Sequence, residues 1–311
     1  LDRAAMSAVL PNTSTPVTAT QKPSYEELVD KGLAGPNLLV NGESGTGKTH
    51  SLGTMVDWCQ RNGFECFYMD IENSLETLLG YWRTPVDGSA AKPVPDCLRI
   101  HQIKVAPVSL AQMIAGAKDT GDLSYELLTK KQDPSRGSNN AFLKILSAMA
   151  NFKDDRTGKE HGPVDKFGAN QVFMLDSFTE LSNAAAKMVI GARPTMAPPD
   201  YGVAQNHLMN FLRLCTQGMP CTFVMTAHPV RDKNEMTGMV HTTIKTVGTA
   251  IQPEIPPLFS EVIYAVREGN KFSWDTAAYG VVTKTRYLGY KSGITPDFGA
   301  IMDLWRKRAG R

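Results

Sequence analysis

The sequence lacks a dominant charge. Its 311 residues carry 33 Lys and Arg against 31 Asp and Glu, which gives a formal net charge of +2. A strongly basic chain would indicate general binding to nucleic acid or to an acidic membrane. The near-neutral balance excludes that kind of binding, so any site for a polyanion has to be local.

Paired cysteines and long hydrophobic runs are also missing. The five cysteines form neither a CxxC pair nor a cluster with histidine, which argues against a disulfide framework or a zinc site. No apolar stretch approaches the roughly 18 to 20 residues that cross a bilayer, and the first residues lack the basic-then-apolar pattern of a secretory signal. We therefore expect a cytoplasmic protein that makes no contact with a membrane.

The chain is expected to divide into three segments. Residues 1–23 are rich in Ser, Thr and Pro and should form a flexible arm, because they cannot bury enough apolar surface to fold alone. Residues 24–290 should form one domain that begins with a short helix at 24–32. Within it, residues 80–170 give a weak pattern and are interpreted as an enlarged connection. Residues 291–311 are expected to be a C-terminal tail.

Strand and helix patterns alternate through most of the domain. This alternation predicts an α/β fold with a mostly parallel central sheet flanked by helices, and beyond residue 228 a β-rich part follows. Predicted strands lie at 37–40, 64–70, 98–103, 171–176, 222–226, 238–246, 261–267, 271–275 and 279–288. Predicted helices lie after residue 48 and at 110–117, 140–152 and 203–217.

One segment carries a complete phosphate-binding motif, G-x-x-x-x-G-K-[ST], between an apolar strand and a helix start. It consists of Gly42, Glu43, Ser44, Gly45, Thr46, Gly47, Lys48 and Thr49, with His50 next to it. Its backbone N–H groups and the helix N-terminus suit phosphate, Lys48 suits the β and γ phosphates, and Thr49 suits magnesium. The segment predicts a P-loop with ATP and Mg²⁺ as ligands. A chance glycine-rich turn would leave Lys48 without a packing role.

Carboxylates follow two of the predicted core strands. Asp176 ends an apolar strand and is expected to complete the magnesium site with Thr49, although it could instead cap the next helix. Hydrolysis also needs a carboxylate that activates water. Glu72, after the strand at 64–70, is the favoured candidate, and Glu180 is the alternative. A glutamate taken alone is most often an exposed loop residue.

These stretches together resemble the RecA-like ATPase superfamily. Residues 68–76 (YMDIENSLE) resemble the segment that holds the catalytic glutamate, and 173–177 (FMLDS) resemble its Walker B strand. The resemblance implies a RecA-like P-loop NTPase core over about residues 36 to 290 and a catalytic role for Glu72. We judge it nearest to phage-encoded RecA-like proteins of single-strand annealing and recombination, which would place the chain in the host cytoplasm.

The resemblance also gives roles to three residues near the end of the domain. His228 is similar in position to the polar sensor of the γ-phosphate, although a histidine at a strand end is more often structural. Lys284 and Arg286 resemble a K-x-R pair that such ATPases insert into the neighbouring subunit's site, and alternation would put both on one strand face. The alternative is an exposed basic strand. Fingers in trans imply self-assembly into a ring or a filament.

By the same resemblance, the loops at 189–202 and 229–252 would contact single-stranded DNA. Their candidate contacts are Arg193, Arg231, Lys233 and Lys245, with His241 nearby. Tyr201 is their single aromatic residue, which makes base stacking a weak feature. Ordinary mobile surface loops are the alternative.

Three functions remain open on the sequence alone. The first is an ATPase that assembles on single-stranded DNA for recombination, annealing or replication. The second is a helicase or DNA-packaging translocase, and the third is a nucleotide-controlled assembly switch that does not bind DNA. The sequence does not decide which nucleotide base the site prefers or whether the assembly is a ring or a filament. It also leaves open the role of residues 80–170 and the partner of the arm.

Overall fold

The fold is that of a computed structural model, which describes residues 34–85, 88–104, 110–121, 140–191, 193, 195–233 and 238–308. The predicted arm and the predicted helix at 24–32 lie outside these residues. Within the described ranges, no helix combines the length and the apolar character needed to cross a membrane.

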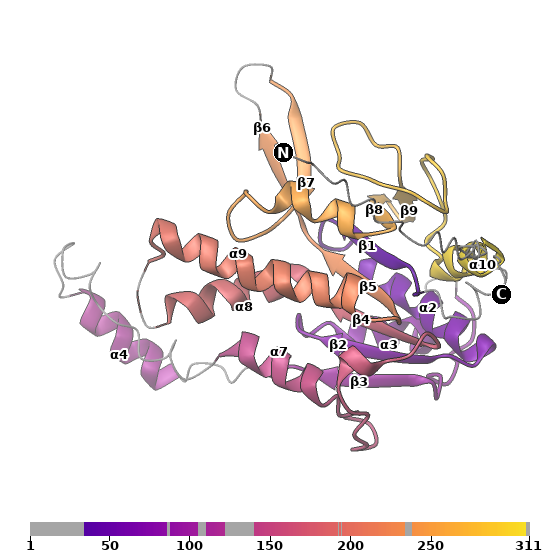
Figure 1. The fold of residues 1–311 in the computed structure, drawn as a ribbon, viewed down its shortest axis with the longest axis horizontal. Helices are drawn as coiled ribbons and strands as arrows, with labels where there is room; N and C mark the ends of the chain where they lie inside the picture. The colour runs from indigo at the N-terminus through magenta and orange to yellow at the C-terminus, as the bar shows by residue number, and fades with distance from the viewer. Residues whose placement is uncertain are drawn as a thin grey trace, which may run out of the picture.

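A seven-stranded sheet forms the centre of the domain, in the order β3-β2-β4-β5-β1-β8-β9 (Figure 1). All neighbouring strands are parallel except β8 and β9. The strands are β1 (Asn37–Gly42), β2 (Glu65–Asp70), β3 (Leu98–Gln102), β4 (Gln171–Asp176), β5 (Thr222–Ala227), β8 (Glu261–Glu268) and β9 (Lys271–Asp275). The predicted α/β class, with a mostly parallel central sheet flanked by helices, is confirmed.

Helices cover both faces of this sheet, as the near-continuous apolar strands require. One face carries α2 (Lys48–Asn62), α3 (Leu75–Arg83) and α10 (Phe298–Arg308), and the other carries α7 (Ala141–Ala150), α8 (Phe178–Ile190) and α9 (Pro198–Arg213). Alternation in β1 divides the core: Leu38 and Val40 belong to the cluster under α2, whereas Leu39 belongs to the cluster under α8. Because these strands are parallel, their carboxyl ends lie together along one edge of the sheet, between the two helix layers.

The enlarged connection contains more regular structure than its weak pattern suggested. It includes β3, α4 (Leu110–Gly121), α7 and the short 3₁₀ helix Val164–Lys166. Asn140 caps α7 by accepting a hydrogen bond from the backbone N–H of Leu143, at 3.1 Å. The predicted strand at 98–103 and the helices at 110–117 and 140–152 are therefore confirmed, with boundaries shifted by a few residues.

Both loops predicted to contact DNA are shorter or more ordered than expected. The loop expected at 189–202 is reduced because α8 continues to Ile190 and α9 begins at Pro198, which places Tyr201 inside a helix. The loop expected at 229–252 is largely a hairpin of β6 (Pro229–Lys233) and β7 (Val240–Ile244) that projects from the domain (Figure 1). β-Branched residues in β7 favour this extended pairing.

The strand predicted at 279–288 is wrong. Its residues make only isolated bridges, from Val281 to Thr242 and from Lys284 to Val262. The buried Glu261 carboxylate accepts hydrogen bonds from the backbone N–H groups of Arg286 and Tyr287, at 2.6 and 2.5 Å. These N–H groups are therefore not available to a strand ladder.

The predicted C-terminal tail contains helix α10. Trp58 of α2 donates its indole N–H to Asp303 at 2.7 Å, and Thr54 of α2 accepts from the backbone N–H of Phe298 at 2.9 Å. These contacts dock the helix against the P-loop side of the sheet. The division of the chain into arm, core and tail stays a prediction.

Candidate functional site

The P-loop connects β1 to α2 in a conformation that requires glycine. Gly45 and Gly47 have φ values of +75° and +81°, in the left-handed region that side chains avoid. A side chain at Gly42 would lie 2.8 Å from the backbone oxygen of Ala265. Glycine at these three positions therefore leaves the backbone N–H groups of the loop accessible. A phosphate chain needs such access in order to bind them.

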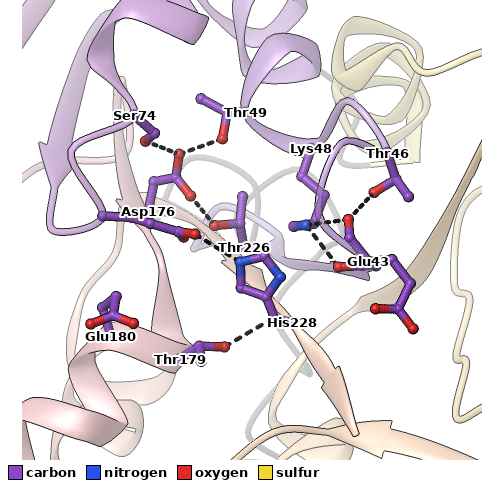
Figure 2. A network of polar contacts seen from close by, with 12 residues as sticks. Glu43, Thr46, Lys48, Thr49, Ser74, Asp176, Thr179, Glu180, Thr226 and His228 are labelled. Carbon is purple, nitrogen blue, oxygen red and sulfur yellow. Dashed lines mark hydrogen bonds and ion pairs between the residues drawn. The ribbon is translucent and has the colours of Figure 1, made fainter. Parts of the chain in front are cut away.

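Lys48, the first residue of α2, reaches back over this loop. Its ammonium donates to the carbonyl oxygens of Gly42 at 2.7 Å and Glu43 at 2.9 Å (Figure 2). Burial lowers the pKa of Lys48, while the carboxylates of Glu72, Asp176 and Glu43 oppose that shift. The ammonium is thus held in a largely dry site whose surrounding charge is negative.

Asp176 lies at the end of β4 and is the centre of a hydroxyl network (Figure 2). It is 1% exposed. Its Oδ2 accepts from Thr49 at 2.7 Å, Ser74 at 2.8 Å and Tyr68 at 3.0 Å, and its Oδ1 accepts from Thr226. Four donors from separate elements fix this carboxylate, so it is more than a cap of the next helix.

The Thr49 hydroxyl and the Asp176 carboxylate form an oxygen pair that suits magnesium. Mg²⁺ is commonly bound by one or two carboxylates together with substrate phosphates and water. Among the described residues no group of three or more His, Cys, Asp or Glu side chains could hold a metal on its own. The predicted donor set therefore fits a magnesium ion that shares its coordination with a triphosphate.

Glu72 and His228 come together at the same edge of the sheet. His228 Nε2 lies 2.8 Å from Glu72 Oε1, and because a carboxylate only accepts, the ring N–H is the donor. The backbone N–H of His228 donates to the Thr179 hydroxyl at 2.9 Å. Burial disfavours the charged form of Glu72, but the His228 hydrogen bond and the Lys48 charge hold its pKa below the usual value.

Glu180 has different surroundings. It lies in the first turn of α8, where its carboxylate accepts from Asn183 of the same helix at 3.0 Å. Figure 2 shows its side chain apart from Asp176 and His228. Glu180 and Glu72 both line a cleft of about 630 Å³ that also includes Asn73 and Lys187. The polar network therefore includes Glu72 and not Glu180.

The other predicted site residues have contacts or surroundings of their own. The His50 ring makes an edge contact with Tyr81, at 5.1 Å between centroids, and burial lowers its pKa. Lys284 donates to the carbonyl of Pro257 at 3.0 Å, and the Arg286 side chain is exposed. Ser44 is exposed at the tip of the P-loop, and Thr46 donates to the Glu43 carbonyl at 2.8 Å.

The four predicted DNA contacts come from three segments of the chain. Arg193 pairs with Asp200 at 2.9 Å beside the start of α9. Arg231 pairs with Glu43 of the P-loop, Lys233 ends β6, and Lys245 follows β7. His241 is exposed on β7.

Sequence reasoning missed the three hydroxyls that join Thr49 on Asp176, and it missed Glu261. Tyr68 and Thr226 lie in the strands on either side of β4, near their carboxyl ends, so strand adjacency could have found them. Glu261 had one signal, a charged residue directly before the apolar run of residues 262–266.

Comparisons with known proteins find similarities to solved structures at low sequence identity. No protein-family model and no curated protein sequence matches the chain. The chain is similar to the flagellar accessory protein FlaH from Methanocaldococcus jannaschii, with 12% identity and a TM-score of 0.32 over 88% of this chain and 98% of that one. It is also similar to EscN, the ATPase solved with its central stalk EscO from the type III secretion system of enteropathogenic E. coli. That match has 12% identity and a TM-score of 0.37 over 90% of this chain and 54% of EscN.

Proposed function

We propose that this chain is a magnesium-dependent ATPase with a RecA-like site. The observation that carries the proposal is the placement, at one sheet edge, of a complete P-loop, the Thr49–Asp176 pair and the Glu72–His228 pair. Each pair joins elements that are distant in the sequence. A structural cluster would not require a glycine-dependent loop beside a buried lysine.

Each residue has a distinct part in the reaction. The P-loop N–H groups and Lys48 bind the phosphates, and the bound metal would supply a Lewis acid that neutralises phosphate charge. Glu72 orients a water molecule and takes up its proton as the water oxygen attacks the terminal phosphorus. The bond from that phosphorus to the oxygen that bridges it to the β-phosphate breaks, and ADP leaves. His228 holds the Glu72 carboxylate by its 2.8 Å hydrogen bond. Its contact with the proposed base suits a sensor of the terminal phosphate.

We further propose that Lys284 and Arg286 act on the site of a neighbouring protomer. The exposed Arg286 side chain can reach a partner, and Glu261 holds its backbone through the N–H at 2.6 Å. Cations from the next protomer would stabilise the charge that develops at the leaving phosphate oxygens. Turnover then depends on assembly into a ring or a filament.

Single-stranded DNA is the proposed partner of the assembly. The β6–β7 hairpin projects from the domain and carries Lys233, with Lys245 directly after it. Lysines of this kind can contact the phosphate backbone without reading bases. Arg193 and Arg231 are already paired with carboxylates, so we assign the DNA contact to Lys233 and Lys245 first. Recombination, annealing or replication, in a phage, is the process that this activity would serve.

Two measurements test the proposal. Steady-state ATP hydrolysis with magnesium should be present in the wild type and absent in Lys48→Ala. Electron microscopy with a non-hydrolysable ATP analogue should show rings or filaments, and single-stranded DNA should promote them and raise turnover. If oligomer formation and the rate of hydrolysis do not change when DNA is added, an assembly switch is favoured. Unwinding of DNA or translocation along it would favour a motor. A monomer under all conditions would overturn the action in trans.

A further inference from the structure

An ion pair links the β6–β7 hairpin to the P-loop. Arg231 Nη2, on β6, lies 3.0 Å from Glu43 Oε1, the residue that follows the end of β1. The two side chains are 61% and 50% exposed. Exposed pairs of this kind contribute little to stability and exchange partners easily. The pair therefore holds the guanidinium beside the P-loop without locking it there.

The pair lies at the end of the site where the terminal phosphate is expected. β1 and β5 are parallel neighbours with Asn41 opposite Ala227, so Glu43 and His228 leave the sheet side by side. His228 contacts Glu72, the proposed base, and a base must face the phosphorus that is attacked. Arg231 follows His228 by three residues along the chain.

The charge at this end of the site favours an additional cation. Three carboxylates, those of Glu72, Asp176 and Glu43, act on the Lys48 ammonium. A triphosphate would bring further negative charge to the same place. A guanidinium presents a planar set of N–H donors that binds carboxylate and phosphate with the same geometry. Arg231 can therefore exchange one anion for the other.

We infer that Arg231 is a phosphate-binding residue that acts within its own protomer. Its guanidinium leaves the Glu43 carboxylate and binds the γ-phosphate of the bound triphosphate. This inference rests on the proposed ATPase function and reassigns Arg231 from DNA to the nucleotide. Because ADP lacks the γ-phosphate, the contact contributes to triphosphate affinity and not to diphosphate affinity.

The test compares the affinities of a fluorescent non-hydrolysable ATP analogue and a fluorescent ADP, without DNA. Arg231→Ala should weaken analogue binding by about fivefold, the upper range for an exposed charge pair, and leave ADP binding within about twofold. Arg231→Lys should restore part of the loss. Glu43→Gln should tighten analogue binding, because the competing carboxylate is gone.

Arg99→Ala is the matched control. Arg99 makes a similar ion pair, 3.1 Å from Glu65, but at the opposite edge of the sheet, where β2 begins. It should leave both affinities unchanged. Equal losses for analogue and ADP in Arg231→Ala, or no loss for either, would overturn the inference while the ATPase proposal stands. A wild-type protein that binds neither nucleotide would overturn the ATPase proposal itself, and the inference with it.

Discussion

Replacing Glu261 should show how two properties of this buried carboxylate, its acceptor oxygen and its charge, each change the free energy of unfolding. Glu261 is fully buried on β8, where its Oε1 accepts from the N–H groups of Arg286 and Tyr287 at 2.6 and 2.5 Å. Glu261→Ala leaves both donors without a partner, at a cost of about 1–3 kcal/mol each. Because the segment is partly exposed, we expect the lower part of that range, about 2–3 kcal/mol in total. This is a large fraction of the roughly 5–15 kcal/mol that stabilises a domain.

Glu261→Gln should behave differently because it keeps an acceptor oxygen and removes the charge. Glu261 Oε2 has no hydrogen-bond partner among the described residues, and burial raises the pKa of this carboxyl above its ordinary value of 4.5. The wild-type free energy of unfolding should therefore fall as the pH rises from 4.5 through the raised pKa, since unfolding releases the proton. Glu261→Gln should not show that fall, and at pH 7 it should be at least as stable as the wild type.

Urea unfolding followed by tryptophan fluorescence measures these differences, because Trp58, Trp82 and Trp274 are buried. The comparison needs the wild type and both variants between pH 4 and pH 8. Equal unfolding free energies for Glu261→Ala and Glu261→Gln at pH 7 would refute the role of the carboxylate oxygen as an acceptor. The same pH dependence in the wild type and Glu261→Gln would refute the raised pKa.

Two further predictions concern Arg286, the proposed arginine finger, and the thiols of Cys97 and Cys221. Arg286→Ala should lower steady-state turnover by about a thousandfold, the range of an arginine finger, while the isolated protomer keeps its affinity for an ATP analogue. Unchanged hydrolysis would remove the finger role. Burial raises the pKa of Cys97 and of Cys221 to about 12, so both thiols should resist alkylation at pH 8 in the native protein and react in urea. Rapid labelling of native Cys97 would contradict its packing.

The parts of the site that the sequence predicted are those coded by short local patterns. The P-loop needs glycines and a lysine within eight residues, and Asp176 directly follows an apolar strand. The parallel sheet then brings strand ends together, with Asp70 opposite Asp176 and Asn41 opposite Ala227. Strand-end residues predicted one by one therefore meet at one edge.

The parts that the sequence did not predict depend on contacts between distant residues. Tyr68 and Thr226 belong to strands whose patterns indicate only burial, yet their hydroxyls bind Asp176. The alternation of residues at 279–288 indicated a strand, but two backbone N–H groups there donate to the Glu261 carboxylate, about 25 residues earlier in the sequence. Gly280 and Gly289, with φ values of +71° and +73°, also bend the segment. Neither the hydrogen bonds to Glu261 nor these glycine turns change the local pattern of apolar residues, so that pattern still indicated a strand.

Single-turnover ATP hydrolysis by Glu72→Gln and Glu180→Gln tests the central claim most directly. Glutamine at position 72 keeps an acceptor for His228 but cannot take up a proton from water. We predict that Glu72→Gln binds an ATP analogue as the wild type does and hydrolyses ATP about 10² to 10⁴ times more slowly, while Glu180→Gln stays close to the wild type. Loss of hydrolysis in Glu180→Gln with normal hydrolysis in Glu72→Gln would contradict the account.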